Sequence, residues 1–344
     1  MNTDWQQFLQ SRGAVFEHGR VVHFGDAAEE LRRSAQQPIL ADLSHYALIR
    51  LAGDDAQTFL QGQVSNDVRL LNGENSQWAA YCTPKGRMLA SFLLWRDAQG
   101  FLMQLPASLK EPIRKRLSMF VLRSKVTLSD ESANWVCLGL AGPGAGQTLG
   151  ETLGVTPPAP HGVLSLAEGT LLSLPGGCFE ILTPPAGAPA LWDRLAQRFL
   201  PVGSDRWDWH LLRAGIPVIL PATQEEFVPQ MVNFELVGGV SFKKGCYPGQ
   251  EIVARTQYLG KPKRRMYLAH LTSATPPQPG DALFSADMGD QASGVIVNAA
   301  AAPEGGYDVL AVIHTASAAA GSLHWKRPDG PVLQLGELPY AVPL

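Results

Sequence analysis

The sequence has few cysteines, and their spacing excludes several common kinds of site. Its 344 residues contain only Cys82, Cys137, Cys178 and Cys246, with no Cys-x-x-Cys pair. This spacing argues against a zinc ribbon, a thioredoxin motif or an iron–sulfur site built by this chain alone, and no metal ligand set is expected. A cluster shared with another protein stays compatible with it. Four scattered free thiols fit a reducing compartment.

An excess of positive charge and long apolar runs are also missing. The formal net charge is −3, so the chain as a whole has no excess positive charge that would indicate nucleic acid binding. The segment from Met1 to Trp5 has no apolar core, unlike a secretory signal, and no uninterrupted apolar run is long enough to span a membrane. We therefore expect a cytoplasmic protein without membrane contact. Its length favours two or three domains.

The richest chemistry lies in residues 243–256, KKGCYPGQEIVART. Gly245 and Gly249 bracket Cys246, which predicts a tight loop followed by a short strand or a helix start. Two preceding lysines would lower the pKa of the Cys246 thiol if their ammonium groups lie close to it. We therefore expect Cys246 and Lys244 to act as a reactive pair. The alternative is a turn in which Cys246 is a small buried apolar residue.

Residues 244–251, Lys-Gly-Cys-Tyr-Pro-Gly-Gln-Glu, resemble the signature of the YgfZ-type folate-binding proteins. These proteins are relatives of the glycine-cleavage T-protein, an aminomethyltransferase. A more diffuse series upstream, in residues 43–45, 53–56, 59–63 and 66–67, resembles the N-terminal region of the same superfamily. The resemblance implies tetrahydrofolate, or a folate derivative, as the cofactor.

The periodicity of the chain predicts an α+β fold. Residues 78–82 and 88–95 predict one hairpin, residues 170–174 and 178–182 predict another, and residues 109–122 predict an amphipathic helix with Phe120 facing inward. Only short strands follow Met266. With the resemblance, we expect a T-protein-like body over residues 1–258, made of antiparallel sheets with packed helices in two interleaved subdomains, and a small C-terminal β-barrel over residues 262–344.

A strand at 135–142 runs into the glycine-rich turn 143–147, which invites a dinucleotide-binding interpretation. The spacing departs from Gly-x-Gly-x-x-Gly, and no acidic residue closes a βαβ unit about twenty residues later. We therefore interpret this stretch as an ordinary strand, loop and helix of an α+β domain.

The resemblance also implies which residues hold folate. A folate needs a flat apolar slot, polar partners for the pterin edge and cations near its glutamate tail. By position, Tyr46 and Trp207 match the family's ring-contacting aromatics, although a tryptophan in such a segment is more often a core residue. Residues 261–265 are expected either to meet the tail or an RNA phosphate, or to form a solvated linker. The other matched residues are Lys85, Arg87, Gln250, Glu251 and Arg255.

The sequence departs from the T-protein enzymes at two acidic positions. Those enzymes carry an acidic pair just after a glycine-containing turn, where this chain has Ala90 and Ser91 after residues 85–89. They also carry a glutamate in a hairpin that here reads Pro-Gly-Gly-Cys, at residues 175–178. The carboxylates that would serve acid–base chemistry in aminomethyl transfer are therefore absent from these positions.

Three functions follow from these observations. The first is a tetrahydrofolate-binding accessory protein for iron–sulfur enzymes, with transient partners such as the radical enzymes that methylthiolate tRNA, and with possible tRNA contact. The second is a folate-dependent one-carbon transferase that acts on an unknown small substrate. The third is a non-catalytic RNA or protein adaptor, which the neutral charge disfavours.

Overall fold

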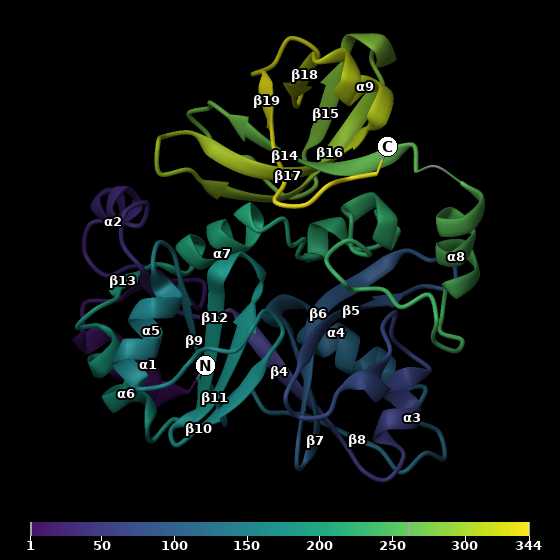
Figure 1. The fold of residues 1–344 in the computed structure, drawn as a ribbon. Helices are drawn as coiled ribbons and strands as arrows, with labels where there is room; N and C mark the ends of the chain where they lie inside the picture. The colour runs from purple at the N-terminus through teal and green to yellow at the C-terminus, as the bar shows by residue number, and fades with distance from the viewer. Residues whose placement is uncertain (1, 261, 344) are drawn as a thin grey trace.

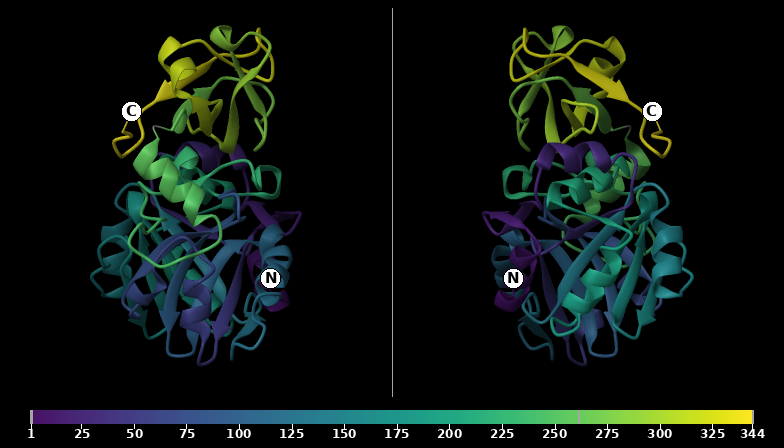
Figure 2. Two further views of the ribbon diagram at one scale, coloured as in Figure 1. Left: turned by 90° about the vertical axis from the view of Figure 1, so that its right-hand side faces the viewer. Right: turned by 90° about the vertical axis from the view of Figure 1, so that its left-hand side faces the viewer.

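Two sheets face each other in the body of the molecule, and a third sheet lies above them (Figure 1). The structure is a computed structural model that describes residues 2–260 and 262–343. Both side views in Figure 2 show the third, C-terminal sheet above the body. Among the described residues, we find no helix that is long and apolar enough to cross a membrane.

The first body sheet is antiparallel and carries helices on its outer face. Its five strands lie in the order β5 (Ser76–Cys82), β6 (Met88–Asp97), β7 (Gly100–Pro106), β4 (Tyr46–Ala52) and β8 (Thr127–Asp130). Apolar residues of α3 (Ala56–Gln61) and α4 (Ala107–Ser118) pack on this outer face. The short helix η1 (Val68–Leu70) follows α3.

The second body sheet has six strands. They lie in the order β10 (Val163–Leu166), β11 (Gly169–Leu174), β12 (Cys178–Thr183), β9 (Val136–Ala141), β3 (Ile39–Asp42) and β13 (Leu200–Val202). Only β13 and β3 pair in parallel among the described residues. Its outer face is covered by α1 (Thr3–Ser11), α5 (Ala145–Leu153) and α6 (Ala188–Leu195). Strand β9 pairs antiparallel with both neighbours, which agrees with rejecting a dinucleotide fold.

The inner faces of the two body sheets meet in one apolar layer, and α7 (Ser204–Arg213) closes its upper end. The remaining body elements are the hairpin β1 (Val15–Glu17) and β2 (Arg20–His23), helix α2 (Ala27–Arg33), and the short helices η2 (Pro175–Gly177), η3 (Pro221–Thr223) and η4 (Pro229–Val232). Asp26 caps α2 by accepting hydrogen bonds from the backbone of Ala28 and Glu29.

The C-terminal sheet is antiparallel and curled. Its strands lie in the order β18 (Leu323–Trp325), β15 (Ala282–Ser285), β16 (Ala292–Ala301), β17 (Tyr307–His314), β14 (Arg264–Leu271) and β19 (Leu333–Gly336). A bridge between His324 and Val332 links its two ends, which gives the expected small barrel. The short helix η5 (Ala286–Met288) and helix α9 (Thr315–Ala320) complete it.

The expected α+β class, with antiparallel sheets and packed helices, is therefore confirmed. One detail is wrong, because α4 ends at Ser118 and Phe120 lies outside it with 47% of its surface exposed. Leu122 beyond it is 87% exposed and has a left-handed backbone, so the chain has left the helical path.

Candidate functional site

The cysteine loop, residues 243–249, is pressed against the basic turn, residues 83–87. A Cβ atom on Gly249 would lie 2.5 Å from the Thr83 carbonyl oxygen and 2.6 Å from the Gly86 Cα atom. Gly249 has a φ of +83° and begins α8 (Gln250–Leu259). Only glycine permits both this backbone and this approach. The fold thus brings Lys85 and Arg87 beside the cysteine loop.

Lys244 is buried, and its ammonium group points into the body rather than toward solvent. Nζ donates hydrogen bonds to the carbonyl oxygens of Gln61, at 2.7 Å, and Val64. It also lies 4.9 Å from the ring centroid of Tyr247. Burial lowers the pKa of Lys244 to about 8, although Asp67 opposes this shift. Lys244 therefore anchors the cysteine loop to the end of α3.

Cys246 is exposed, whereas the other three cysteines are buried. Gln250 turns back toward the loop, with Nε2 at 3.5 Å from the Lys244 carbonyl oxygen. Glu251 and Arg255 are exposed on α8, which lies at the right-hand edge of Figure 1. The structure thus exposes the Cys246 thiol on a loop that contacts the basic turn and leads into α8, the elements that carry Lys85, Arg87, Gln250, Glu251 and Arg255.

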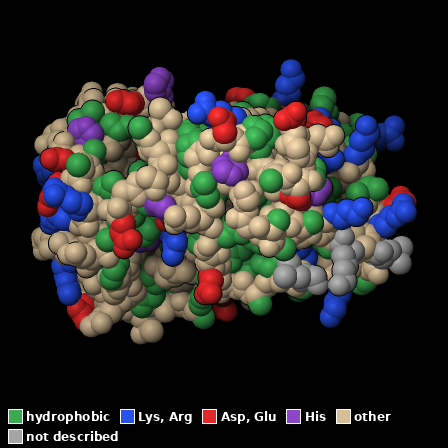
Figure 3. Space-filling view, turned by 90° about the horizontal axis from the view of Figure 1, so that it is seen from above, with side chains coloured by type: hydrophobic (Ala, Val, Ile, Leu, Met, Phe, Trp, Pro, Cys, Tyr) green, Lys and Arg blue, Asp and Glu red, His purple; other side chains and the backbone are tan. Residues whose placement is uncertain are grey.

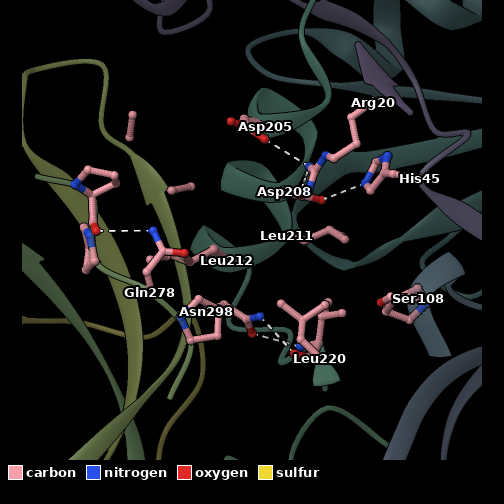
Figure 4. A pocket seen from close by; sticks show the side chains of 18 of the residues that line it. Arg20, His45, Ser108, Asp205, Asp208, Leu211, Leu212, Leu220, Gln278 and Asn298 are labelled. Carbon is pink, nitrogen blue, oxygen red and sulfur yellow. Dashed lines mark hydrogen bonds and ion pairs between the residues drawn. The ribbon is translucent and has the colours of Figure 1, made fainter. Parts of the chain in front are cut away.

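A separate cavity of about 670 Å³ lies between α7, the start of β4 and the C-terminal sheet (Figure 4). Of the expected site residues, only Tyr46 lines it. Leu211 and Leu212 of α7 supply apolar walls, and Pro276 to Pro279 approach from the C-terminal domain. No residue of 243–256 lines this α7 cavity, so Cys246 and the cavity are separate features of the molecule.

An ion-pair cluster borders one side of the α7 cavity. Asp208 accepts from Arg20 and lies 3.1 Å from Nε2 of His45, as the dashed lines in Figure 4 show. Burial alone would raise the pKa of the Asp208 carboxyl, but His45 and Arg20 hold it well below its ordinary value. Arg20 also pairs with Asp205 at 3.0 Å. The wall of the α7 cavity therefore carries two carboxylates, Asp205 and Asp208, which share one guanidinium, that of Arg20.

Trp207 does not line the α7 cavity. It is fully buried and packs over Gly139, where a Cβ atom would lie 2.7 Å from the indole ring. Trp207 is therefore a core residue, which is the more common role for a tryptophan in such a segment. Its Nε1 atom nevertheless has no hydrogen-bond partner among the described residues, which is unusual for a buried indole.

The sequence analysis missed Glu180, which lies on β12 directly opposite Gly139 and so beside Trp207. Glu180 is 2% exposed, and burial raises the pKa of its carboxyl to about 7. Its Oε2 atom makes no hydrogen bond of good geometry among the described residues, although the Gln104 side chain is close enough to oppose the rise in pKa. A glutamate inside the apolar strand sequence Cys-Phe-Glu-Ile-Leu was the signal that could have revealed it.

These groups fit the pterin end of a folate better than its charged tail. Burial raises the pKa of Tyr46 well above its ordinary value, and the nearby Asp208 and Glu180 carboxyls add to this rise. The Glu180 carboxyl and the Trp207 Nε1 donor are of the kind that a pterin edge pairs with, although neither residue lines the α7 cavity. Within residues 2–260 and 262–343, no three His, Cys, Asp or Glu side chains are grouped to hold a metal ion.

Ser91, which stands where the T-protein enzymes carry an acidic residue, also lies close to the α7 cavity. The Ser91 hydroxyl donates to the Pro217 carbonyl oxygen at 3.3 Å and accepts from the Ile219 amide at 3.0 Å. Val218, between them, lines the α7 cavity. Ser91 therefore supports the cavity wall and offers no carboxylate to a ligand.

Comparisons with known proteins agree with this architecture. A family model described as the GCVT N-terminal domain matches residues 6–161. The tRNA-modifying protein YgfZ of Sodalis glossinidius (strain morsitans) is 34% identical over 308 residues, covering 88% of this chain and 93% of that protein. The protein of the same name from Escherichia coli O45:K1 (strain S88 / ExPEC) is 33% identical over 314 residues, covering 90% and 95%.

A solved structure extends the fold comparison to nearly the whole chain. The glycine cleavage system aminomethyltransferase T from Bartonella henselae superposes with a TM-score of 0.79 at 19% identity, covering 98% of this chain and 97% of that one. Together with the sequence identity above, this shows that the chain belongs to the YgfZ family and has the aminomethyltransferase fold.

Proposed function

We propose that this protein binds tetrahydrofolate in the α7 cavity and supports the assembly or repair of iron–sulfur enzymes, including radical enzymes that methylthiolate tRNA. The name of its relatives, tRNA-modifying proteins, supports the tRNA side of this proposal. The observation that carries the folate side is Tyr46, an aromatic ring on the wall of a cavity that the apolar side chains of Leu211 and Leu212 also line.

The residues of the cavity would divide the work of binding. Leu211, Leu212 and the Tyr46 ring would contact the flat faces of the pterin. The Glu180 carboxyl, whose pKa is raised to about 7, can both donate and accept near neutral pH. The α7 cavity holds Arg20 already paired with two carboxylates, so the glutamate tail would extend toward solvent.

An accessory role fits better than aminomethyl transfer because Ala90 and Ser91 replace the acidic pair, and Ser91 is used to hold the cavity wall. The exposed Cys246 lies on a surface apart from this cavity.

One observation favours the alternative, a folate-dependent one-carbon transferase acting on an unknown small substrate. A buried carboxyl with a pKa near 7 is suited to general acid–base work, and Glu180 has this property and lies close enough to Tyr46 of the α7 cavity to affect the pKa of that phenol. Turnover of a methylamine or formaldehyde donor with tetrahydrofolate, lost in Glu180→Gln, would establish this second function.

Calorimetric titration with tetrahydrofolate tests the ligand. We expect binding heat at protein concentrations below about 1 mM, and about tenfold weaker binding by Tyr46→Ala than by Tyr46→Phe. Tyr258→Ala, on α8 and away from the cavity, serves as the control and should bind normally. A titration of the wild type without heat would end the folate proposal. Deleting the gene and measuring methylthiolated tRNA nucleosides tests the process separately, with a loss expected.

A further inference from the structure

Positively charged side chains gather at the end of the molecule where α8 lies. Figure 3 shows Lys and Arg clustered at the right-hand end, the side on which Figure 1 places α8. Lys85 on the basic turn, Lys243 on the cysteine loop and Arg255 on α8 are exposed, as is Cys246. This concentration contrasts with the formal net charge of −3 for the whole chain.

Several other cations on the body form ion pairs with carboxylates, but the three cations at the α8 end form none with the described residues. Arg12 pairs with Asp193, Arg198 with Glu151 and Lys110 with Asp130. Lys85, Lys243 and Arg255 have no carboxylate within salt-bridge distance in the part of the chain that the structure describes. Exposed Glu251 is the one acidic residue of α8. The α8 end therefore keeps a local positive field that can attract a polyanion.

Large apolar side chains are exposed next to the same cations. Tyr258 is 68% exposed and packs edge-on against Phe242, with ring centroids 6.0 Å apart. Ile252, which contacts the basic turn at Gly86, is 38% exposed. Exposed aromatic rings interleaved with cations are typical of surfaces that stack unpaired bases while holding the phosphate backbone.

We propose that α8, the cysteine loop and the basic turn form an RNA-binding face, with the Cys246 thiol exposed on it. RNA fits this face better than an acidic protein because Tyr258 offers a ring of base size beside unneutralised cations. The choice of tRNA as the RNA rests on the proposed function, because the relatives are named tRNA-modifying proteins. The assignment of the face to RNA does not rest on it. The face is separate from the α7 cavity, so folate binding and RNA binding are independently testable.

Fluorescence anisotropy with a labelled, unmodified tRNA transcript tests this face. We expect the wild-type chain to bind at about 50 mM salt and to lose affinity steeply by about 200 mM. The triple variant Lys85→Glu, Lys243→Glu and Arg255→Glu should weaken binding roughly a hundredfold, because three phosphate contacts become repulsive. Tyr258→Ala should weaken it about tenfold through the lost stacking.

The matched control reverses Arg32, Arg33 and Arg327, which are exposed elsewhere and change the net charge equally. Its affinity should stay within about twofold of the wild type. Tyr46→Ala should retain tRNA binding, which separates a failure of this proposal from a failure of the folate proposal. Absence of wild-type binding at low salt, equal losses in both triple variants, or displacement of the tRNA by polyglutamate but not by unlabelled tRNA would each overturn the RNA assignment.

Discussion

The Lys244 ammonium group donates a hydrogen bond to the Gln61 carbonyl oxygen, 2.7 Å away, at the C-terminal end of α3. A cation at this end of a helix satisfies carbonyl groups that have no partner within the helix. Lys244 is therefore a positioning residue for the cysteine loop, while Cys246, two residues later, faces solvent. The expectation that the two side chains act as one reactive pair stays a prediction.

Replacing Lys244 by methionine should lower the free energy of unfolding by about 1–3 kcal/mol, because two buried carbonyl oxygens lose their donor. Urea unfolding measures this change. Lys243→Met is the control, since Lys243 is exposed, and it should stay within about 0.5 kcal/mol of the wild type. Equal stability of the two variants would contradict an anchoring role.

The two glycines around Cys246 should respond differently to alanine. Gly249→Ala places a Cβ atom 2.5 Å from the Thr83 carbonyl oxygen at a φ of +83°, so we expect a loss of about 1–3 kcal/mol in the free energy of unfolding. Gly245→Ala meets no atom within 4 Å and should be nearly neutral. Thermal unfolding of both variants decides the matter, and a tolerated Gly249→Ala would refute the close contact between loop and turn.

One of the four thiols should react quickly with Ellman's reagent in the native protein. Cys246 is exposed, whereas burial raises the pKa of Cys82 and of Cys178 to about 12, which leaves almost no thiolate near neutral pH. Cys246→Ser should therefore show no fast phase, and unfolding in urea should release the three remaining thiols. A second fast thiol in the native wild type would be inconsistent with the described burial.

Glu180→Gln should stabilise the protein in a pH-dependent way. Burial raises the folded-state pKa of Glu180 from an ordinary 4.5 to about 7. Below pH 4.5 the carboxyl is protonated in both the folded and the unfolded protein and costs no stability. As the pH rises through 7, the folded protein must hold a buried negative charge, and its stability falls. We expect the variant to exceed the wild type in unfolding free energy by up to about 3 kcal/mol above pH 7 and to match it near pH 4. A difference that does not change with pH would show that Glu180 is not buried as an acid.

The sequence predicted the elements well where periodicity was strong. Both hairpins appear as β5–β6 and β11–β12, because short apolar runs separated by turn residues match strands that are buried on both faces of a sheet. The end of α4 was mispredicted because Phe120 and Leu122 continue an apolar pattern that the folded chain leaves exposed. Periodicity reports which residues are apolar, and it does not report whether a surface covers them.

By itself, the sequence determined the family and the α+β class, because these depend on residue types and patterns at short spacing. Tertiary structure alone decided that Cys246 and the α7 cavity are separate sites, since sequence order carries no distance between segments. It also revealed Glu180, whose environment is made by β9, β12 and α7 together, and it turned Lys244 inward to carbonyl groups about 180 residues earlier in the chain.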